Sequence, residues 1–183
     1  KHSWEELDWL NTLASEQESQ RKELAELAIA EAPMHASYVH QSVAQQLTDD
    51  DILVFDGGDF CHFGRAFYQS NSYNSWWYLP TLGMLGQAIP TAIAAKIAHP
   101  NRRVIVFTGD GAFGFNGMEY DTAVRHHIPI VGIMGNDSAW GIDRQIQLGV
   151  FGKPVATDLL PSRYDQVVRA LGGHGELVEH PSE

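Results

Sequence analysis

The segment at residues 107–121, FTGDGAFGFNGMEYD, places one carboxylate between two glycines at the end of an apolar run. That acid is Asp110, and its neighbours are Gly109 and Gly111. In open parallel α/β sheets, ligands bind outside the carboxyl ends of the strands. Glycines allow backbone N–H groups to approach phosphate oxygens closely, and the N-terminus of a following helix favours negative charge. The segment is therefore suited to hold a phosphate group beside a metal-binding carboxylate.

A second polar group follows the next apolar run, residues 130–135, where Asn136 and Asp137 stand. Between Gly111 and Asn136 lie 24 residues, enough for one helix between two strands. If the strands are neighbours, the carboxylate of Asp110 and the amide oxygen of Asn136 face the same crevice. With a backbone carbonyl just beyond Asn136, they provide half of an octahedral shell, which Mg²⁺ completes with phosphate and water.

Apolar runs alternate with helical patterns along the rest of the chain. Runs typical of buried strands lie at residues 51–55, 103–108, 130–135 and 175–180, and helical patterns lie at 37–47, with Ser37 as the cap, and at 84–98, 117–127 and 164–173. Residues 73–83 are aromatic and rich in turn formers, which predicts a loop. The alternation predicts an α/β fold, a doubly wound, mainly parallel sheet with helices on both faces.

Composition restricts the partners. The chain has 183 residues, a formal net charge of −11 and a single cysteine, Cys61. An acidic chain whose only Lys/Arg doublets are at 21–22 and 102–103 is not expected to bind nucleic acid or an anionic membrane. An anionic ligand must instead be held locally, by backbone N–H groups or a metal. One cysteine excludes an internal disulfide framework and suits a reducing compartment.

The ends of the chain predict a piece of a longer polypeptide, because it begins at Lys1 and stops at VEHPSE, where a strand exit is followed by proline. Residues 1–34 are interpreted as a helical linker from a preceding domain, since leucines at helical spacing stand in a charged background over residues 4–31. Residues 35–183 are interpreted as the main domain, truncated at its C-terminus. The alternative is a complete chain with a trimmed start.

The sequence around the motif resembles that of thiamine diphosphate-dependent enzymes. The segments GDGAFGFNGMEYDTAVRHHIPIV, LPTLGMLGQAIPTAIAAKIAHPNRRVIV and DGGDF are similar to the diphosphate-binding (PP) domain of the branch with 2-hydroxyacyl-CoA lyase, oxalyl-CoA decarboxylase and acetolactate synthase. The sequences GDGAFGF and GME are more similar to those of the acyl-CoA members of this branch. Gly135 departs from the pattern, since many members carry an Asn there, but the ligand is normally the following Asn136.

The resemblance implies a set of site residues. Asp110 and Asn136 would bind Mg²⁺ through their side chains, and Ser138 through its carbonyl. The cofactor-binding set would comprise Gly83, Leu85, Gly109, Asp110, Gly111, Ala112, Asn136, Ser138, Trp140 and Gly141. Within it, Leu85 would prop thiamine diphosphate in a bent shape and the carbonyl of Gly83 would accept a hydrogen bond from the pyrimidine amino group. Trp140 and Gly141 would begin a helix that closes over the cofactor.

The resemblance also implies partners. The glutamate that activates the cofactor lies, in the family, in a separate domain of another subunit, and no counterpart is found here. The expected protein is a homo-oligomer, a dimer or tetramer, whose site is shared between subunits. The remaining domains of the same polypeptide are further expected partners. The expected location is cytoplasmic, with a peroxisomal location as the alternative for a eukaryotic source. The expected activity is that of a carbon–carbon lyase acting on a 2-hydroxyacyl-CoA, which is split to an aldehyde or ketone and formyl-CoA. Oxalyl-CoA decarboxylation and acetolactate-type chemistry on 2-oxo acids are the alternatives.

Several other residues have two readings. One loop holds Asp59, Cys61, His62 and Arg65, for which a polar substrate or interface loop is favoured over zinc because the spacing fits no usual zinc pattern. His62 is also a candidate substrate contact. The aromatic residues at 76–78 either line an acyl or coenzyme A channel or form a subunit contact, the second being favoured.

Two further features are interpreted as structural. Glu119 is a candidate general acid, but its place in the helix after the motif favours a structural role. The neighbouring His126 and His127 project to different sides of a helix, so a role at the helix end is favoured over a metal pair.

The sequence disfavours two function classes other than a lyase. A non-catalytic assembly or regulatory subunit is disfavoured by the intact metal-binding residues. A Rossmann dinucleotide-binding domain is disfavoured because no G-x-G-x-x-G follows any of the apolar runs.

Overall fold

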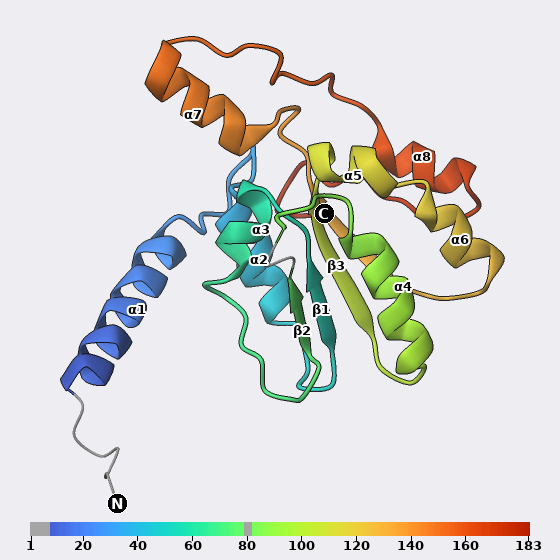
Figure 1. The fold of residues 1–183 in the computed structure, drawn as a ribbon, viewed down its shortest axis with the longest axis horizontal. Coiled ribbons are helices and arrows are strands. Elements are labelled where there is room, and N and C mark those ends of the chain that lie inside the picture. Colours follow the sequence, from blue (N-terminus) through green and yellow to red (C-terminus); the bar gives the residue numbers. More distant parts are fainter. Residues whose placement is uncertain (1–7, 79–81) are drawn as a thin grey trace, which may run out of the picture. The chain divides into compact units, whose positions relative to one another are not determined.

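The computed structural model describes residues 8–78 and 82–183, which fall into two compact units (Figure 1). The first unit contains the described residues up to Gln46, together with Phe63–Tyr68 and Glu179–Glu183. The second contains Leu47–His62 and Gln69–Val178, and with them the whole sheet. No helix in the described part of the chain is long and apolar enough to cross a membrane.

The first unit contains α1 (Asp8–Glu26) and α2 (Ala36–Ala44). The helix predicted at 4–31 is confirmed over Asp8–Glu26 and was wrong over residues 27–31, which are not helical. The prediction that Ser37 caps α2 was wrong. His35 is the N-cap: its backbone is extended, and its imidazole Nδ1 accepts a hydrogen bond from the Ser37 N–H at 3.1 Å. Ser37 instead lies buried within the first turn of α2. The capping acceptor comes from the imidazole of His35, two residues earlier.

The second unit is an α/β fold, as predicted. Its elements are β1 (Ile52–Phe55), the first residues of α3 (Asp59–Gly64), β2 (Trp76–Tyr78), α4 (Ala88–Ala98), β3 (Val104–Gly109), α5 (Asp110–Asn116), α6 (Glu119–Arg125), β4 (Val131–Gly135), α7 (Gly141–Phe151) and α8 (Tyr164–Ala170). The four strands are parallel and lie in the order β2-β1-β3-β4. Each crossover runs through at least one helix, which is how parallel strands are connected.

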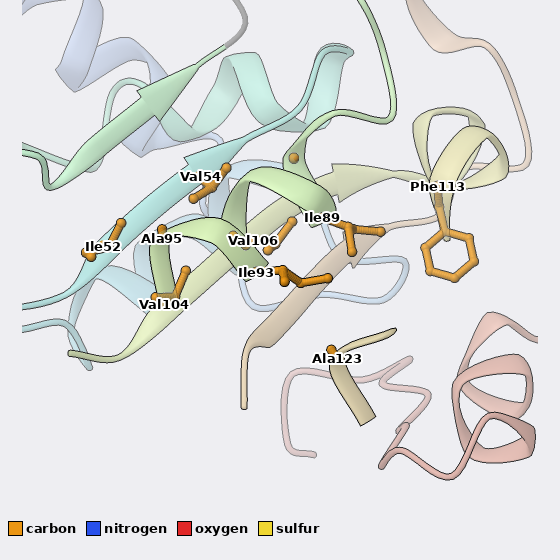
Figure 2. Packing of buried hydrophobic residues seen from close by; sticks show 11 residues of the cluster. Ile52, Val54, Ile89, Ile93, Ala95, Val104, Val106, Phe113 and Ala123 are labelled. Atoms are coloured by element: carbon orange, nitrogen blue, oxygen red, sulfur yellow. The ribbon is translucent and has the colours of Figure 1, made fainter. Parts of the chain in front are cut away.

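The central strands β1 and β3 are buried on both faces, which explains their unbroken apolar sequences. On one face they pack against α4, whose alanines and isoleucines allow close approach (Figure 2). The core cluster on this face comprises Ile52, Val54, Ala88, Ile89, Ala92, Ile93, Ala95, Val104, Val106, Phe113 and Ala123. On the other face the Phe55 ring stacks on Phe107, with ring centroids 4.7 Å apart.

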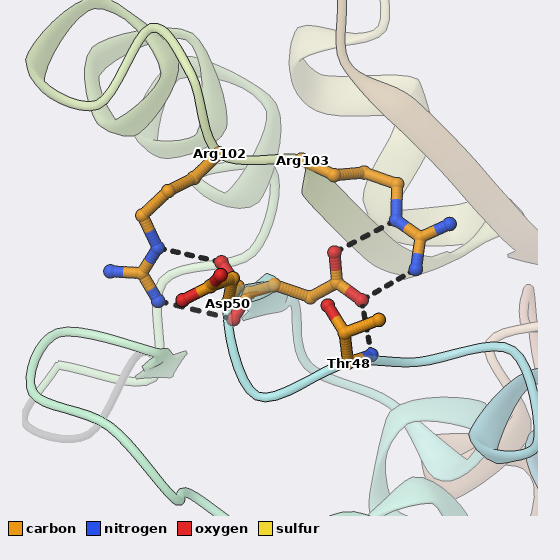
Figure 3. Close-up of polar contacts among 5 residues, drawn as sticks. Thr48, Asp50, Arg102 and Arg103 are labelled. Carbon is orange, nitrogen blue, oxygen red and sulfur yellow. Dashed lines mark hydrogen bonds and ion pairs between the residues drawn. The ribbon is translucent and has the colours of Figure 1, made fainter.

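Charged residues fix the amino ends of β1 and β3 (Figure 3). The buried carboxylate of Asp51 accepts a hydrogen bond from Nε of Arg103 at 2.8 Å and another from the Thr48 N–H at 2.7 Å. Arg102 donates from Nε to the carbonyl of Asp50 at 2.6 Å. These contacts align the strand starts, at the end of the sheet opposite to the predicted site.

Residues 73–83 were predicted to be a loop, and this was wrong for residues 76–78, which form the edge strand β2. Trp76 pairs with Leu53 of β1, and its ring stacks on Phe55 with centroids 4.4 Å apart. Aromatic side chains suit a pleated, half-buried strand, and this packing outweighed the turn-forming residues nearby. Residues 79–81, which begin the motif LPTLG, lie outside the described part of the chain.

The strand predicted at residues 175–180 was also wrong, because these residues pair with no strand in the described structure and stay exposed. Three helices of the second unit differ from their predicted bounds. The helix expected at 84–98 begins only at Ala88, since Gly86 adopts a positive φ of +83°. The helix expected at 117–127 is α6, preceded by the separate helix α5. The predicted helix at 164–173 corresponds to α8, after which Gly172 has a φ of +88°.

Candidate metal and phosphate site

Asp110 stands where β3 ends and α5 begins. Its side chain is 2% exposed, and Oδ1 accepts a hydrogen bond from the Gly111 N–H at 3.0 Å. The other oxygen, Oδ2, is buried and has no hydrogen-bond partner among the described residues. An unpaired buried carboxylate oxygen is costly for a protein, so a partner that is not part of this chain, such as a cation, fits this position.

Electrostatics around Asp110 support the same interpretation. Burial raises the pKa of the Asp110 carboxyl group, the backbone N–H groups of Gly111, Asp110 and Ala139 oppose this shift, and the negative charge of Asp137 adds to it. Among the described residues, no Lys or Arg contributes to this balance. A divalent cation would remove the cost of keeping Asp110 ionised, because an opposite charge nearby favours the charged form.

Asn136 follows the strand next to that of Asp110. Gly109 of β3 pairs with Gly135 of β4, so both polar residues leave the sheet at the same level. The prediction that the two strand ends are neighbours is therefore confirmed. The exposed Asn136 side chain donates from Nδ2 to the Ser162 carbonyl at 3.2 Å, and its Oδ1 accepts from the Ser138 N–H at 3.2 Å. Oδ1 also accepts a longer hydrogen bond from Oγ of Ser138 at 3.5 Å. Because this hydroxyl can rotate away, Oδ1 remains capable of binding a metal.

Ser138 adopts a left-handed backbone conformation with a φ of 55°. Its carbonyl, the predicted third ligand, accepts a hydrogen bond from the Leu159 N–H at 2.7 Å. Beside it, the Trp140 N–H donates to the Thr157 carbonyl at 2.8 Å, and Ala139 forms an antiparallel bridge with Asp158. The segments before and after α7 are thus joined to each other, which fixes the start of this helix.

Trp140 lies directly against the predicted phosphate-binding segment. A Cβ atom at Gly111 would lie 2.9 Å from Cε3 of the Trp140 ring, closer than real Cβ atoms approach other atoms. The same ring meets Phe115 edge to face, with centroids 5.8 Å apart. Only glycine at position 111 therefore lets the indole pack against the start of α5, where Ala112 is also buried.

Gly141 reveals two acids that the sequence did not assign to this site. A Cβ atom at Gly141 would lie 3.0 Å from Oδ2 of Asp137 and 3.1 Å from Oδ2 of Asp59. Burial raises the pKa of Asp59, which His62 lowers and Asp137 raises further. The sequence held one indication of this role, because Asp59 lies shortly after the carboxyl end of β1, at the same edge of the sheet as Asp110 after β3.

Gly83 and Leu85 lie in the loop between β2 and α4. Gly83 is exposed and has a φ of +60°, and Leu85 is half-buried. A Cβ atom at Gly57, just after β1, would lie 2.3 Å from Cδ2 of Leu85. The missing side chain at position 57 is thus what makes room for Leu85 at the carboxyl end of the sheet.

Other candidate residues have structural partners. Glu119 accepts a hydrogen bond from Oγ1 of Thr122 at 2.7 Å within α6, which supports its structural interpretation. His126 is the C-cap of α6, which confirms a helix-end role for the pair of histidines. Cys61 is buried and donates to the Phe107 carbonyl at 3.2 Å. Among the described residues, no three His, Cys, Asp or Glu side chains are grouped to hold a metal, as the zinc alternative would require.

Comparisons with known proteins identify the family of the chain and its fold. The family model "Thiamine pyrophosphate enzyme, C-terminal TPP binding domain" matches residues 56–183. A solved structure from Rhodococcus jostii RHA1, of a thiamine diphosphate-dependent 4-hydroxybenzoylformate decarboxylase, shares the fold with a TM-score of 0.75 at 23% sequence identity, covering 81% of this chain and 28% of that one.

Curated relatives are more similar in sequence. A probable acetolactate synthase of Mycobacterium bovis is 41% identical over 96% of this chain and 32% of its own length. A 2-hydroxyacyl-CoA lyase 2 of Caenorhabditis elegans is 34% identical over 97% of this chain and 28% of its own length. The chain thus spans about a third of the length of the curated relatives it matches. From the family match and these relatives, the chain belongs to the thiamine pyrophosphate enzymes and carries their C-terminal TPP-binding domain.

Proposed function

We propose that the full-length protein is a thiamine diphosphate- and Mg²⁺-dependent enzyme that cleaves a carbon–carbon bond next to a carbonyl or hydroxyl carbon. One observation carries the proposal: Oδ2 of Asp110 is buried without a partner at the carboxyl end of β3, beside the strand end that bears Asn136. In a chain of this family, that oxygen would be suited to hold a divalent cation, which would neutralise the charge of a diphosphate.

In the proposed site, the side chains of Asp110 and Asn136 and the carbonyl of Ser138 hold Mg²⁺. The backbone N–H group of Ala112 would receive the diphosphate, and that of Gly111 would do so only by leaving Oδ1 of Asp110, to which it donates in this structure. The charge of the diphosphate is not neutralised by this acidic protein without the metal. When bound, thiamine diphosphate supplies the nucleophilic carbon and the electron sink for the bond that breaks.

The remaining residues orient the other half of the cofactor. The side chain of Leu85 would support the ring-bearing half of the cofactor, and the Gly83 carbonyl would be available as an acceptor for its pyrimidine amino group. Trp140 and Gly141 cover the diphosphate end and exclude water from it. The activating glutamate comes from another domain, contributed by a second subunit of a homo-oligomer.

The first candidate substrate is a 2-hydroxyacyl-CoA, split to an aldehyde or ketone and formyl-CoA. The sequence around the motif and the similarity to the Caenorhabditis elegans lyase support this candidate. The second candidate is acetolactate formation from 2-oxo acids, which the 41% identity to the Mycobacterium bovis relative favours. Oxalyl-CoA decarboxylation is the further alternative within the same branch.

The test incubates the full-length protein with thiamine diphosphate, Mg²⁺ and, separately, 2-hydroxyacyl-CoA thioesters, oxalyl-CoA and pyruvate. Formyl-CoA together with an aldehyde or ketone supports the first candidate, and acetolactate alone moves the function to the second. Absence of any product in the presence of bound cofactor would favour a non-catalytic assembly or regulatory subunit.

The metal and cofactor assignment has its own test. Asp110→Ala should abolish measurable binding of thiamine diphosphate and its dependence on Mg²⁺. Asp121→Ala is the matched control, because Asp121 is an exposed aspartate of α6 paired with Arg125, and it should bind the cofactor like the wild type. Unchanged cofactor affinity in Asp110→Ala would contradict the proposed function.

A further inference from the structure

Asp56 is a buried carboxylate directly after β1, and it binds a segment thirty positions later in the chain. It is 1% exposed. Oδ1 accepts hydrogen bonds from the N–H groups of Gly57 at 2.9 Å and Gly86 at 3.0 Å. Oδ2 accepts from Gly86 at 3.1 Å and from Ala88 at 3.2 Å. Both oxygens are therefore satisfied by backbone groups, two of which belong to the segment that leads into α4.

These bonds complete the start of α4. Its N-cap residue, Gln87, makes no side-chain capping bond, so the first N–H groups of the helix need an acceptor from elsewhere. Asp56 provides it, and a carboxylate at a helix N-terminus also interacts favourably with the helix dipole. Burial raises the pKa of Asp56, while the N–H groups of Gly57, Gly86 and Ala88 lower it.

The segment bound by Asp56 is the loop that carries Gly83 and Leu85. A second contact holds this loop from the other side, because Nδ2 of Asn116 in α5 donates to the Gly86 carbonyl at 3.0 Å. A Cβ atom at Gly86 would lie 2.4 Å from Cβ of Phe115, so the loop packs closely on α5. The loop is thus fastened both to the end of β1 and to the helix that begins with Asp110.

From this arrangement we infer that Asp56 is a positioning residue: it holds Gly83 and Leu85 at a fixed distance from Asp110. The ring-binding part and the diphosphate-binding part of the site are then spaced to fit one molecule of thiamine diphosphate. The inference rests on the proposed function. It concerns the ring-binding half of the site, which Asp56 orders through the loop, and leaves the anchoring of the diphosphate to Asp110. The two halves are separable by experiment because inorganic pyrophosphate with Mg²⁺ occupies only the anchoring half.

The experiment compares the full-length wild type with Asp56→Asn. Asparagine keeps the shape but replaces one oxygen by an NH₂ group, so the two hydrogen bonds to that oxygen are lost. The Gly86 N–H can still bond to the remaining oxygen, so one backbone N–H, that of Gly57 or Ala88, is left without its acceptor. We expect the affinity for thiamine diphosphate to fall by about tenfold, because hydrogen bonds to charged groups are the stronger ones. The affinity for pyrophosphate with Mg²⁺ should stay unchanged. The near-ultraviolet circular dichroism that the cofactor rings acquire on binding should weaken at saturating cofactor.

Asp51→Asn is the matched control, since Asp51 is the buried aspartate directly before β1 and contacts Arg103 at the opposite end of the strand. It should lower stability without changing either affinity. Asn116→Ala is the second variant, because Asn116 is exposed and its loss removes the other tether of the same loop without leaving a buried charge. It should show the same separation between the two ligands as Asp56→Asn.

The outcomes distinguish the inference from the proposed function. Loss of thiamine diphosphate affinity with unchanged pyrophosphate affinity in Asp56→Asn supports the inference, and Asn116→Ala provides the same comparison if Asp56→Asn does not fold. Equal loss of both affinities, or loss of neither, overturns it while the proposed function stands. Failure of the wild type to bind thiamine diphosphate overturns both.

Discussion

Gly109 and Gly135 lie opposite each other in the register of β3 and β4, and each is followed at once by a polar residue. Because the strands are parallel neighbours, this one pairing brings Asp110 and Asn136 to the same edge of the sheet. A shift of one residue in register would move one polar residue back into the sheet. The site therefore depends on strand pairing as much as on the residues themselves.

Gly111 and Trp140 should behave as a coupled pair. Gly111→Ala would place a methyl group 2.9 Å from the indole ring, and overpacking of this kind costs roughly 1 to 3 kcal/mol. The free energy of unfolding, from denaturant titration, should fall accordingly. Trp140→Ala in the same chain should remove most of the added cost, and a strictly additive double variant would contradict the contact.

Gly57→Ala should displace Leu85, since the new Cβ atom would lie 2.3 Å from its Cδ2. We expect lower stability by about 1 to 3 kcal/mol and weaker binding of thiamine diphosphate. Gly114→Ala is the control, because nothing lies within 4 Å of a Cβ atom there and α5 favours alanine. That variant should gain about 0.5 to 1 kcal/mol. A destabilised Gly114→Ala would show that the helix tolerates no added side chain.

Asp51 should make stability depend on acidic pH. Burial raises the pKa of Asp51, but hydrogen bonds from Arg103 and Thr48 and the charge of Arg103 outweigh it, so the pKa lies below 3.8 in the folded protein. A lowered pKa gives stability that is present above pH 3.8 and lost as the pH falls through the folded value. Thermal unfolding should show this loss in the wild type, and Asp51→Asn should show a shallower dependence over the same range.

Tyr120 should make the stability of the protein depend on pH in the alkaline range. Burial raises its pKa from 10.0 to about 12, so its phenol stays neutral in the folded protein when an unfolded chain would already be ionised. The stability it contributes is complete below pH 10 and is lost as the pH rises toward 12. The difference in stability between wild type and Tyr120→Phe should therefore change across this range. A difference that stays constant would place the phenol in water.

The sequence predicted most of the sheet because β1, β3 and β4 carry apolar runs that end in glycine and polar residues. It missed β2, since three aromatic residues beside turn formers gain strand structure only from pairing with Leu53 and stacking on Phe55. It placed Asp110 and Asn136 from spacing alone. It assigned Asp59 to another loop and gave Asp56 no role, because carboxylates that act across thirty residues leave no local pattern.

The four-stranded order has a consequence for motion. Within the described residues β3 has neighbours on both sides, whereas β4 pairs only with β3. Amide protons of β3 should therefore exchange with solvent only through large-scale opening, and those of β4 through smaller local fluctuations. Asp110 directly follows the strand whose amides exchange slowly, and Asn136 directly follows the strand whose amides exchange faster. The two halves of the proposed metal site would therefore differ in local stability, the carboxylate half being the more rigid.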